Sequence, residues 1–142
     1  MVVDKYKTEV AFYRDVPEIL SHLTKHPDVE AVVSASRTHA PKVAEKMLTL
    51  LHVPHEGTLV PAHDLFDHKV WGIGSKIAHF REIHKRTGVA YTDMVFFDDE
   101  MRNRDVEQQL GVTFVAINEE VGLTWSVFER GIERWKERQN KA

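Results

Sequence analysis

The chain lacks cysteine, an excess of basic residues and any apolar run of membrane-spanning length. Without cysteine, disulfides and thiolate metal sites are excluded. A net charge of −3 gives no electrostatic reason to expect a nucleic-acid partner. A helix that crosses a bilayer needs about 20 consecutive apolar residues, so no membrane partner is expected. Because residues 1–5 (Met-Val-Val-Asp-Lys) show no apolar leader, we expect a cytoplasmic protein.

What is present is ordinary for a globular protein. With 142 residues the chain is long enough to bury a core, and it contains no linker, repeat or low-complexity stretch. We therefore expect a single domain over residues 1–142. The nine histidines are scattered without the paired spacing of metal ligands, so we interpret most of them as surface residues.

Short apolar runs alternate with helical stripes. Strand-like runs occupy residues 31–36, 58–60, 95–97 and 112–117, with a weaker alternating run at 6–12. Helical stripes follow Asp15, begin near Pro41, Ser75 and Asn103, and occupy 124–137, whereas residues 64–74 are expected to form a loop. This order predicts an α/β fold with a mainly parallel sheet and helices on both faces.

The most informative segment is Val95-Phe96-Phe97-Asp98-Asp99-Glu100. An apolar strand ends there in three acidic residues, and crowded carboxylates repel one another unless a cation or a donor satisfies them. Ligands of open α/β sheets bind outside the carboxyl ends of the strands, and carboxylate oxygens suit Mg²⁺. The alternative is that Asp98 or Asp99 caps the next helix. We favour the metal site because one cap does not explain three acids.

Two further segments combine with this strand end. Ser36-Arg37-Thr38 follows the strand at 31–36 and offers hydroxyls, a guanidinium and free N–H groups to an anion, although a plain helix cap explains it equally well. Lys76 lies in the first turn of the helix that begins near Ser75, where the macrodipole disfavours a cation. Taken alone it indicates a solvent-facing lysine; beside the other two segments it indicates a phosphate ligand.

Along the chain the hydroxyl segment comes first, the lysine second and the paired aspartates third. With this order the chain resembles the magnesium-dependent phosphatase family of the haloacid dehalogenase superfamily. The resemblance is carried by residues 12–20, 34–38, 74–76 and 95–103. It implies a haloacid-dehalogenase-like fold, Mg²⁺ as the cofactor and hydrolysis of phosphomonoesters. It also implies partners among small phosphate esters, sugar-linked phosphates and phosphotyrosine, among which the sequence does not choose.

The resemblance also implies a role for each site residue. Ser36 would hydrogen-bond the transferring phosphoryl oxygens, and Lys76 would neutralise the phosphate and position the nucleophile. Asp98 or Asp99 would hold Mg²⁺. Arg37, Thr38 and Asn103 would be supporting groups near the phosphate or the metal. Such a site fits phosphoryl transfer, which depends mainly on positioning and charge neutralisation.

One family motif has no match in these residues. The family pattern begins with Asp-x-Asp-x-Thr at the end of its first strand, which supplies the nucleophile and the general acid and base, and no such motif occurs in the sequence. We therefore expect an N-terminally incomplete domain whose central first strand is missing. Its neighbouring strands would then show unpaired backbone groups and an exposed apolar slot. We therefore expect that the chain alone is poorly stable, fills the slot with another segment such as residues 6–12, or pairs with another chain in an oligomer.

Two main hypotheses follow. Either the gene product is a phosphatase and this sequence begins at an internal methionine, or the chain is a non-catalytic remnant that binds phosphate or Mg²⁺. A receiver-like signalling domain is ranked lower because its acidic pair comes first and its lysine last, the reverse of Lys76 and Asp98. A dinucleotide-binding domain is lower still because no Gly-x-Gly-x-x-Gly follows a strand.

Overall fold

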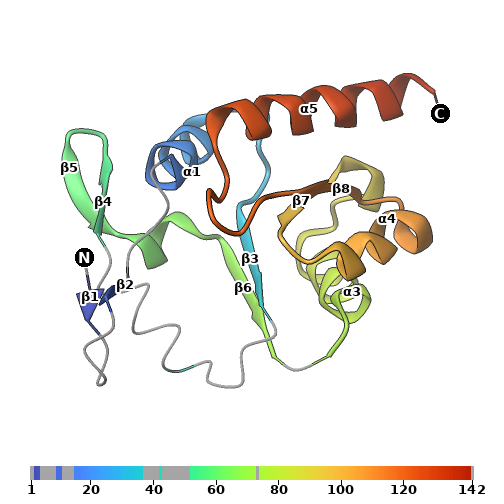
Figure 1. The fold of residues 1–142 in the computed structure, drawn as a ribbon, viewed down its shortest axis with the longest axis horizontal. Coiled ribbons are helices and arrows are strands. Elements are labelled where there is room, and N and C mark those ends of the chain that lie inside the picture. Colours follow the sequence, from blue (N-terminus) through green and yellow to red (C-terminus); the bar gives the residue numbers. More distant parts are fainter. Residues whose placement is uncertain are drawn as a thin grey trace. The chain divides into compact units, whose positions relative to one another are not determined.

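The computed structural model describes residues 2–3, 9–10, 15–36, 42, 52–72 and 74–141 (Figure 1). The chain divides into two compact units, Met1–Ile73 and Gly74–Ala142, here called the N-terminal unit and the C-terminal unit. Each is described by itself. The expectation of one domain over the whole chain stays a prediction. In the described part, no helix is both long and apolar enough to cross a membrane.

The N-terminal unit combines one helix with short strand pairs. Its elements are β1 (Val2–Val3), β2 (Glu9–Val10), α1 (Val16–Lys25), β3 (Val33–Ser36), β4 (His52–His55), β5 (Thr58–Pro61), the 3₁₀ helix η1 (Ala62–Leu65) and β6 (His68–Trp71). β3 and β6 pair in parallel, whereas β1 with β2 and β4 with β5 form antiparallel pairs. The parallel β3–β6 pair is the part of this unit that matches the expected sheet.

A small core holds the N-terminal unit together. The helix expected after Asp15 is α1, which has proline in its first turn and buries Ile19 and Leu20. Leu20 packs with Val32, Ala62 and Leu65 in one buried cluster. This cluster joins α1, the segment that enters β3, and η1.

The C-terminal unit alternates helices with two strands. Its elements are α3 (Lys76–Thr87), the 3₁₀ helices η2 (Tyr91–Asp93) and η3 (Met101–Arg104), β7 (Val95–Asp98), α4 (Asp105–Leu110), β8 (Thr113–Ala116) and α5 (Trp125–Asn140). β7 and β8 pair in parallel, with Val95 opposite Thr113 and Asp98 opposite Ala116. The strands and helices expected in this half of the chain are therefore confirmed.

Local sequence signals set the helix ends of this unit. The Ser75 side chain accepts a hydrogen bond from the Ala78 amide at the start of α3, and Gly88 ends that helix in the left-handed region at φ 70°. Thr124 caps α5 in the same way through the Val127 amide. Gly111 ends α4 with φ 93°.

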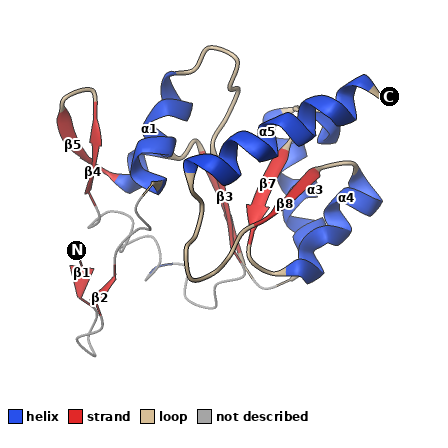
Figure 2. Cartoon of the chain, turned by 45° about the horizontal axis from the view of Figure 1, so that its top comes forward, coloured by secondary structure: helices blue, strands red, loops and turns tan. Residues whose placement is uncertain are grey.

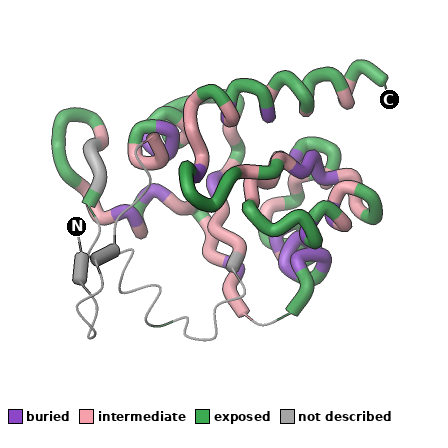
Figure 3. Tube along the Cα trace, in the orientation of Figure 1, coloured by how far each residue is buried: buried purple, intermediate pink, exposed green. Residues whose placement is uncertain are grey.

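Helices cover both faces of the β7–β8 pair (Figure 2). On one face Phe80 of α3 packs edge-on against Phe96, with ring centroids 4.8 Å apart. On the other face Phe97 packs against Phe128 of α5 at 5.8 Å. α5 approaches so closely that a Cβ at Gly131 would lie 2.7 Å from the Phe97 ring. Apart from such close contacts, α5 is exposed along most of its length, and only a few of its positions are buried (Figure 3).

The structure corrects some local expectations. The loop expected at 64–74 is wrong, because η1 and β6 lie there; β6 is too short and polar to show as a strand without its partner β3. The strand expected at 58–60 is confirmed as β5. Of the run at 6–12 the structure describes only Glu9–Val10, which pairs with Val2–Val3. The helix expected near Pro41 lies outside the described residues except at position 42, which is helical.

β7 has one strand neighbour among the described residues, and β3 likewise. The Thr113 amide donates to the Met94 carbonyl, and the Ile117 amide donates to the Asp98 carbonyl, both at 3.0 Å. Parallel strands use alternate residues for each neighbour, so the backbone groups of Val95 and Phe97 point away from β8. That a further strand takes this edge stays a prediction.

Candidate functional site

The carboxyl end of β7 brings together an aspartate and a buried amide. Asp98 is the last residue of the strand and is half-buried, whereas Asp99 is exposed. η3 follows the strand end, and within this turn the backbone N–H of Asn103 donates to the Glu100 carbonyl at 3.0 Å. Asn103 is 0% exposed, and its side-chain Nδ2 donates to Asp98 Oδ2. Asn103 therefore fixes the orientation of the Asp98 carboxylate.

Lys76 reaches the same strand end from α3. It is the first residue of that helix and is only 5% exposed, so a solvent-facing lysine is ruled out. Its positive charge acts on Asp98 and lowers the pKa of that carboxyl. Its Nζ also lies 5.6 Å from the centroid of the Phe96 ring. Lys76, Asp98 and Asn103, which the sequence predicted as site residues, thus share one end of β7.

Burial dominates the charge state of Asp98. Desolvation raises the pKa of its carboxyl, and a hydrogen bond with the Asp99 side chain raises it further. The Asn103 hydrogen bond and the Lys76 charge lower the pKa of Asp98 but do not cancel the effect of burial. The Asp98 carboxyl therefore holds its proton more tightly than an isolated aspartate does. A divalent cation at this position would displace that proton.

The residues at this strand end fit Mg²⁺. Mg²⁺ in proteins binds one or two carboxylates and keeps several waters, and Asp98 with Asp99 supplies such oxygens. The hydrogen bond from Asn103 supports Asp98 as outer-shell partners of metal ligands do. In the described residues no three histidine, cysteine or acidic side chains gather into a complete metal cluster. The ligands offered here are therefore a partial set, and which aspartate binds directly stays open.

The second predicted segment lies in the N-terminal unit. Ser36 is the last residue of β3 and pairs in register with Trp71 of β6. The Trp71 indole Nε1 donates to Ser34 Oγ at 3.0 Å, so Trp71 leans along this strand pair. Arg37 and Thr38 lie outside the described residues. That Ser36, Arg37 and Thr38 meet the residues of the β7 end stays a prediction.

A cavity of about 290 Å³ in the N-terminal unit lies apart from the predicted residues. It is bounded by α1, the β4–β5 hairpin and η1, and none of the site residues predicted from the sequence lines it. The candidate site is thus defined by its side-chain chemistry rather than by this cavity.

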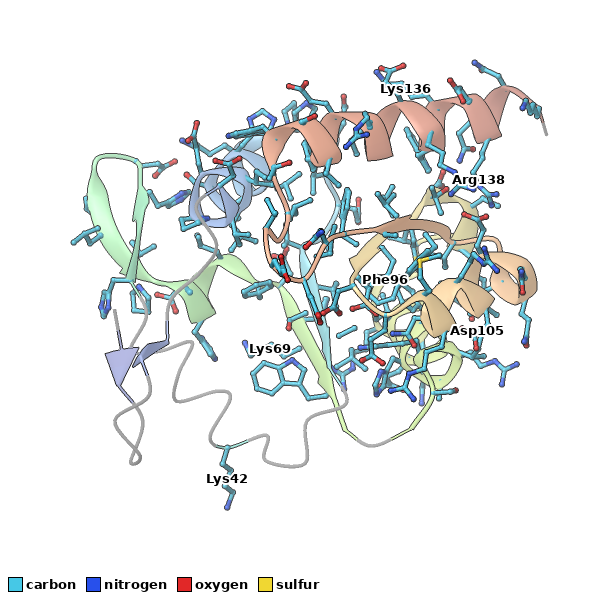
Figure 4. The ribbon with its side chains drawn as sticks, in the orientation of Figure 1. Lys42, Lys69, Phe96, Asp105, Lys136 and Arg138 are labelled. Atoms are coloured by element: carbon cyan, nitrogen blue, oxygen red, sulfur yellow. The ribbon has the colours of Figure 1, made fainter. Side chains whose placement is uncertain are left out.

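Sequence reasoning missed the part played by Phe96. The sequence analysis took residues 95–97 only as an apolar strand, whereas the ring of Phe96 lies beneath the Lys76 ammonium. The signal was present, since residues two apart on a strand share a face and Phe96 stands two before Asp98. Figure 4 labels Phe96 in the C-terminal unit.

Comparison with known proteins places the chain in a class and then in a family. The chain is 50% identical over 116 residues to a protein of Schizosaccharomyces pombe named as a member of the haloacid-dehalogenase-like hydrolase superfamily, an alignment that covers 81% of this chain and 65% of the relative. Together with the α/β architecture and its parallel strand pairs, this similarity defines a haloacid-dehalogenase-like protein.

Within that superfamily the family is also shown. Residues 1–138 match the acid phosphatase family. The chain is 36% identical over 126 residues to a putative magnesium-dependent phosphatase of Saccharomyces cerevisiae (85% of this chain, 69% of the relative). It is 32% identical over 138 residues to human magnesium-dependent phosphatase 1 (97% and 71%). The chain belongs to the magnesium-dependent phosphatase family, and it spans about two thirds of the length of these relatives.

Proposed function

We propose that the protein is a Mg²⁺-dependent phosphomonoester hydrolase and that the end of β7 is one half of its active site. The observation that carries the proposal is the buried Lys76, whose charge acts on the half-buried Asp98 beside a second aspartate. Phosphoryl transfer needs a fixed cation and a metal ion on the phosphoryl oxygens. A buried lysine beside two carboxylates supplies the first and can hold the second.

Each residue has a role in this proposal. Lys76 binds a phosphoryl oxygen as a point charge. Asp98, oriented by Asn103, holds Mg²⁺ with or through Asp99, and the ion when bound supplies charge neutralisation. Ser36, at the end of β3, donates its hydroxyl to a second phosphoryl oxygen. Arg37 and Thr38 complete the anion site.

The proposal takes the nucleophile from outside these 142 residues, which contain no Asp-x-Asp. Loss of a nucleophile removes most of an enzyme's rate enhancement. The isolated chain is therefore expected to bind Mg²⁺ and phosphate with turnover far below that of a complete site. The substrates are small phosphate esters, sugar-linked phosphates or phosphotyrosine. The site works in the cytoplasm.

A second candidate function is binding without hydrolysis. It is favoured by the contrast between the assembled Lys76, Asp98 and Asn103 and the missing Asp-x-Asp motif. In this case the protein holds Mg²⁺ or phosphate and catalyses nothing.

The first test measures Mg²⁺ and orthophosphate binding by calorimetry, together with hydrolysis of p-nitrophenyl phosphate. Asp98→Asn is compared with Asp93→Asn, a matched control beside the opposite end of β7. We expect Mg²⁺ binding to be lost in Asp98→Asn and kept in Asp93→Asn. If the unaltered chain binds neither ion at millimolar concentration, both candidate functions fail.

The intact mass of the protein from its natural source separates the two functions. A mass above 16.4 kDa that corresponds to a few tens of additional N-terminal residues supports the hydrolase, because these residues could form the strand that carries the nucleophile. A mass of 16.4 kDa together with binding and no turnover supports the non-catalytic protein.

A further inference from the structure

The ring of Phe96 lies against the buried ammonium of Lys76. The Nζ atom is 5.6 Å from the ring centroid, within the range of a cation–π interaction. Phe96 and Asp98 stand two residues apart on β7 and therefore share one face of the strand. The same face thus presents an aromatic surface and then a carboxylate to the first turn of α3.

Other aromatic rings hold Phe96 in place. Phe80 of α3 meets it edge-on at 4.8 Å, and Phe114 of β8 meets it edge-on at 6.0 Å. Phe80 is 4% exposed and lies one helical turn after Lys76, so both occupy the same side of α3. The packing of Phe80 on Phe96 therefore also places Lys76 above that ring.

Lys76 needs such a seat because its location is unfavourable for a cation. A charge that is 95% withdrawn from solvent at a helix N-terminus meets both desolvation and the positive end of the macrodipole. Asp98 offsets this in the metal-free protein. Once a cation binds to Asp98, that carboxylate attracts Lys76 less, whereas the face of Phe96 is unchanged.

We propose that Phe96 is a positioning residue that holds the Lys76 ammonium at the end of β7, where it binds phosphate when Mg²⁺ is present. The role toward phosphate rests on the proposed function, and the seating of Lys76 does not. If Phe96 were only a packing residue of the apolar strand, no link between its ring and anion binding would be expected.

The test uses three variants of the full chain. Phe96→Leu removes the aromatic face, whereas Phe96→Tyr keeps it. Phe97→Leu removes an aromatic ring at the next residue of the strand. Phe97 is a matched control because its ring faces α5, 5.8 Å from Phe128, on the other side of the strand. A loss of stability common to both leucine variants is thereby separated from an effect on Lys76.

The first readout is the proton NMR shift of the Lys76 ε-methylene group, assigned by its absence in Lys76→Met. A group above an aromatic face is shifted upfield, so we expect this shift in the unaltered chain, Phe96→Tyr and Phe97→Leu, and its loss in Phe96→Leu. The second readout is the dissociation constant of orthophosphate with Mg²⁺ present. We expect about 10-fold weaker binding in Phe96→Leu and little change in the other two.

The two readouts fail separately. An unshifted Lys76 in the unaltered chain overturns the seating of Lys76 on Phe96. The positioning role is overturned if the unaltered chain shows the upfield shift but Phe96→Leu binds phosphate as tightly as the unaltered chain does. It is also overturned if Phe97→Leu loses as much phosphate affinity as Phe96→Leu. Absence of phosphate binding in the unaltered chain defeats the proposed function and the role toward phosphate, while the NMR shift still decides the seat.

Discussion

The two units of the chain each contain a parallel strand pair, but they surround it differently. In the C-terminal unit α3 and α5 cover opposite faces of β7–β8, and aromatic rings pack on both sides. In the N-terminal unit the small core gathers α1, η1 and the entry to β3. The C-terminal unit brings three of the predicted site residues, Lys76, Asp98 and Asn103, to one end of β7.

The polar contacts of the units differ in the same way. In the C-terminal unit Glu107 of α4 accepts a hydrogen bond from the Phe114 amide at 3.0 Å and a pair of hydrogen bonds from Arg134 of α5. In the N-terminal unit the Asp67 carboxylate accepts from the Val32 amide at 2.6 Å, and the Asp67 amide donates back to the Val32 carbonyl at 2.7 Å. The first set of contacts joins three elements, and the second joins two neighbouring segments.

The largest effect is expected where α5 meets β7. In Gly131→Val the added atoms meet Phe97, whose ring would already lie 2.7 Å from a Cβ. Overpacking of this kind costs about 1–3 kcal/mol, and we expect the upper end because strand and helix backbones limit relaxation. The loss of unfolding free energy is measured by urea unfolding of the full chain, with hydrogen exchange of the amides in the C-terminal unit as the readout. Ser126→Ala, on the exposed surface of α5, is the control. A change within about 0.5 kcal/mol would contradict this packing.

The next effect concerns Glu107. The Arg134 hydrogen bond lowers the pKa of the Glu107 carboxyl despite partial burial. Because its pKa is lower in the folded state, its stabilisation is present above the ordinary glutamate value of about 4.3 and is lost as the pH falls through the lowered value. We expect Glu107→Gln to lose about 1–2 kcal/mol at pH 7 and nothing at the acid end.

The matched control for Glu107 is Glu133→Gln on α5. Glu133 is exposed and lies 3.7 Å from Lys136, and exposed pairs contribute about 0–1 kcal/mol. Urea denaturation from pH 3 to pH 7 follows both variants. A Glu107→Gln deficit independent of pH would show that packing and not the ion pair matters.

A smaller effect is expected in the N-terminal unit. Asp67→Ala removes the acceptor of the Val32 amide, a single hydrogen bond near the surface. We expect a loss of about 1 kcal/mol in this unit, seen as faster exchange of the Val32 amide, with the C-terminal unit unchanged. Asp28→Ala, at an exposed turn of the same unit, is the control. Equal changes in both units would contradict a local effect of this hydrogen bond.

The smallest effect is expected for the metal-free stability of Asp98→Asn. Burial raises the pKa of Asp98, so folding becomes less favourable as the pH rises from the ordinary aspartate value through the raised one. At pH 7 Asp98→Asn removes this penalty but also the charge that offsets buried Lys76, so we expect a metal-free melting temperature close to that of the unaltered chain. Mg²⁺ at 100 times its dissociation constant should add about 2.7 kcal/mol to the unaltered chain and nothing to this variant. A variant that Mg²⁺ still stabilises would remove Asp98 from the metal site.

Much of the C-terminal unit could be predicted from local signals. Ser75 and Gly88 set the ends of α3 because a side-chain cap and a left-handed glycine act within one helical turn. The acidic end of β7 could also be predicted, because its signal lies within a few consecutive residues. β6 was not, since four residues with one buried side chain become a strand only when β3 supplies hydrogen-bond partners.

The sequence by itself determined that a lysine begins a helix and that two aspartates end an apolar strand, because both follow from short-range patterns. Only the tertiary structure decided that these groups lie together at the end of β7. Lys76 is buried and faces Asp98 because Phe80, one turn further along α3, packs on Phe96. That contact joins residues far apart in the chain, and no local propensity specifies it.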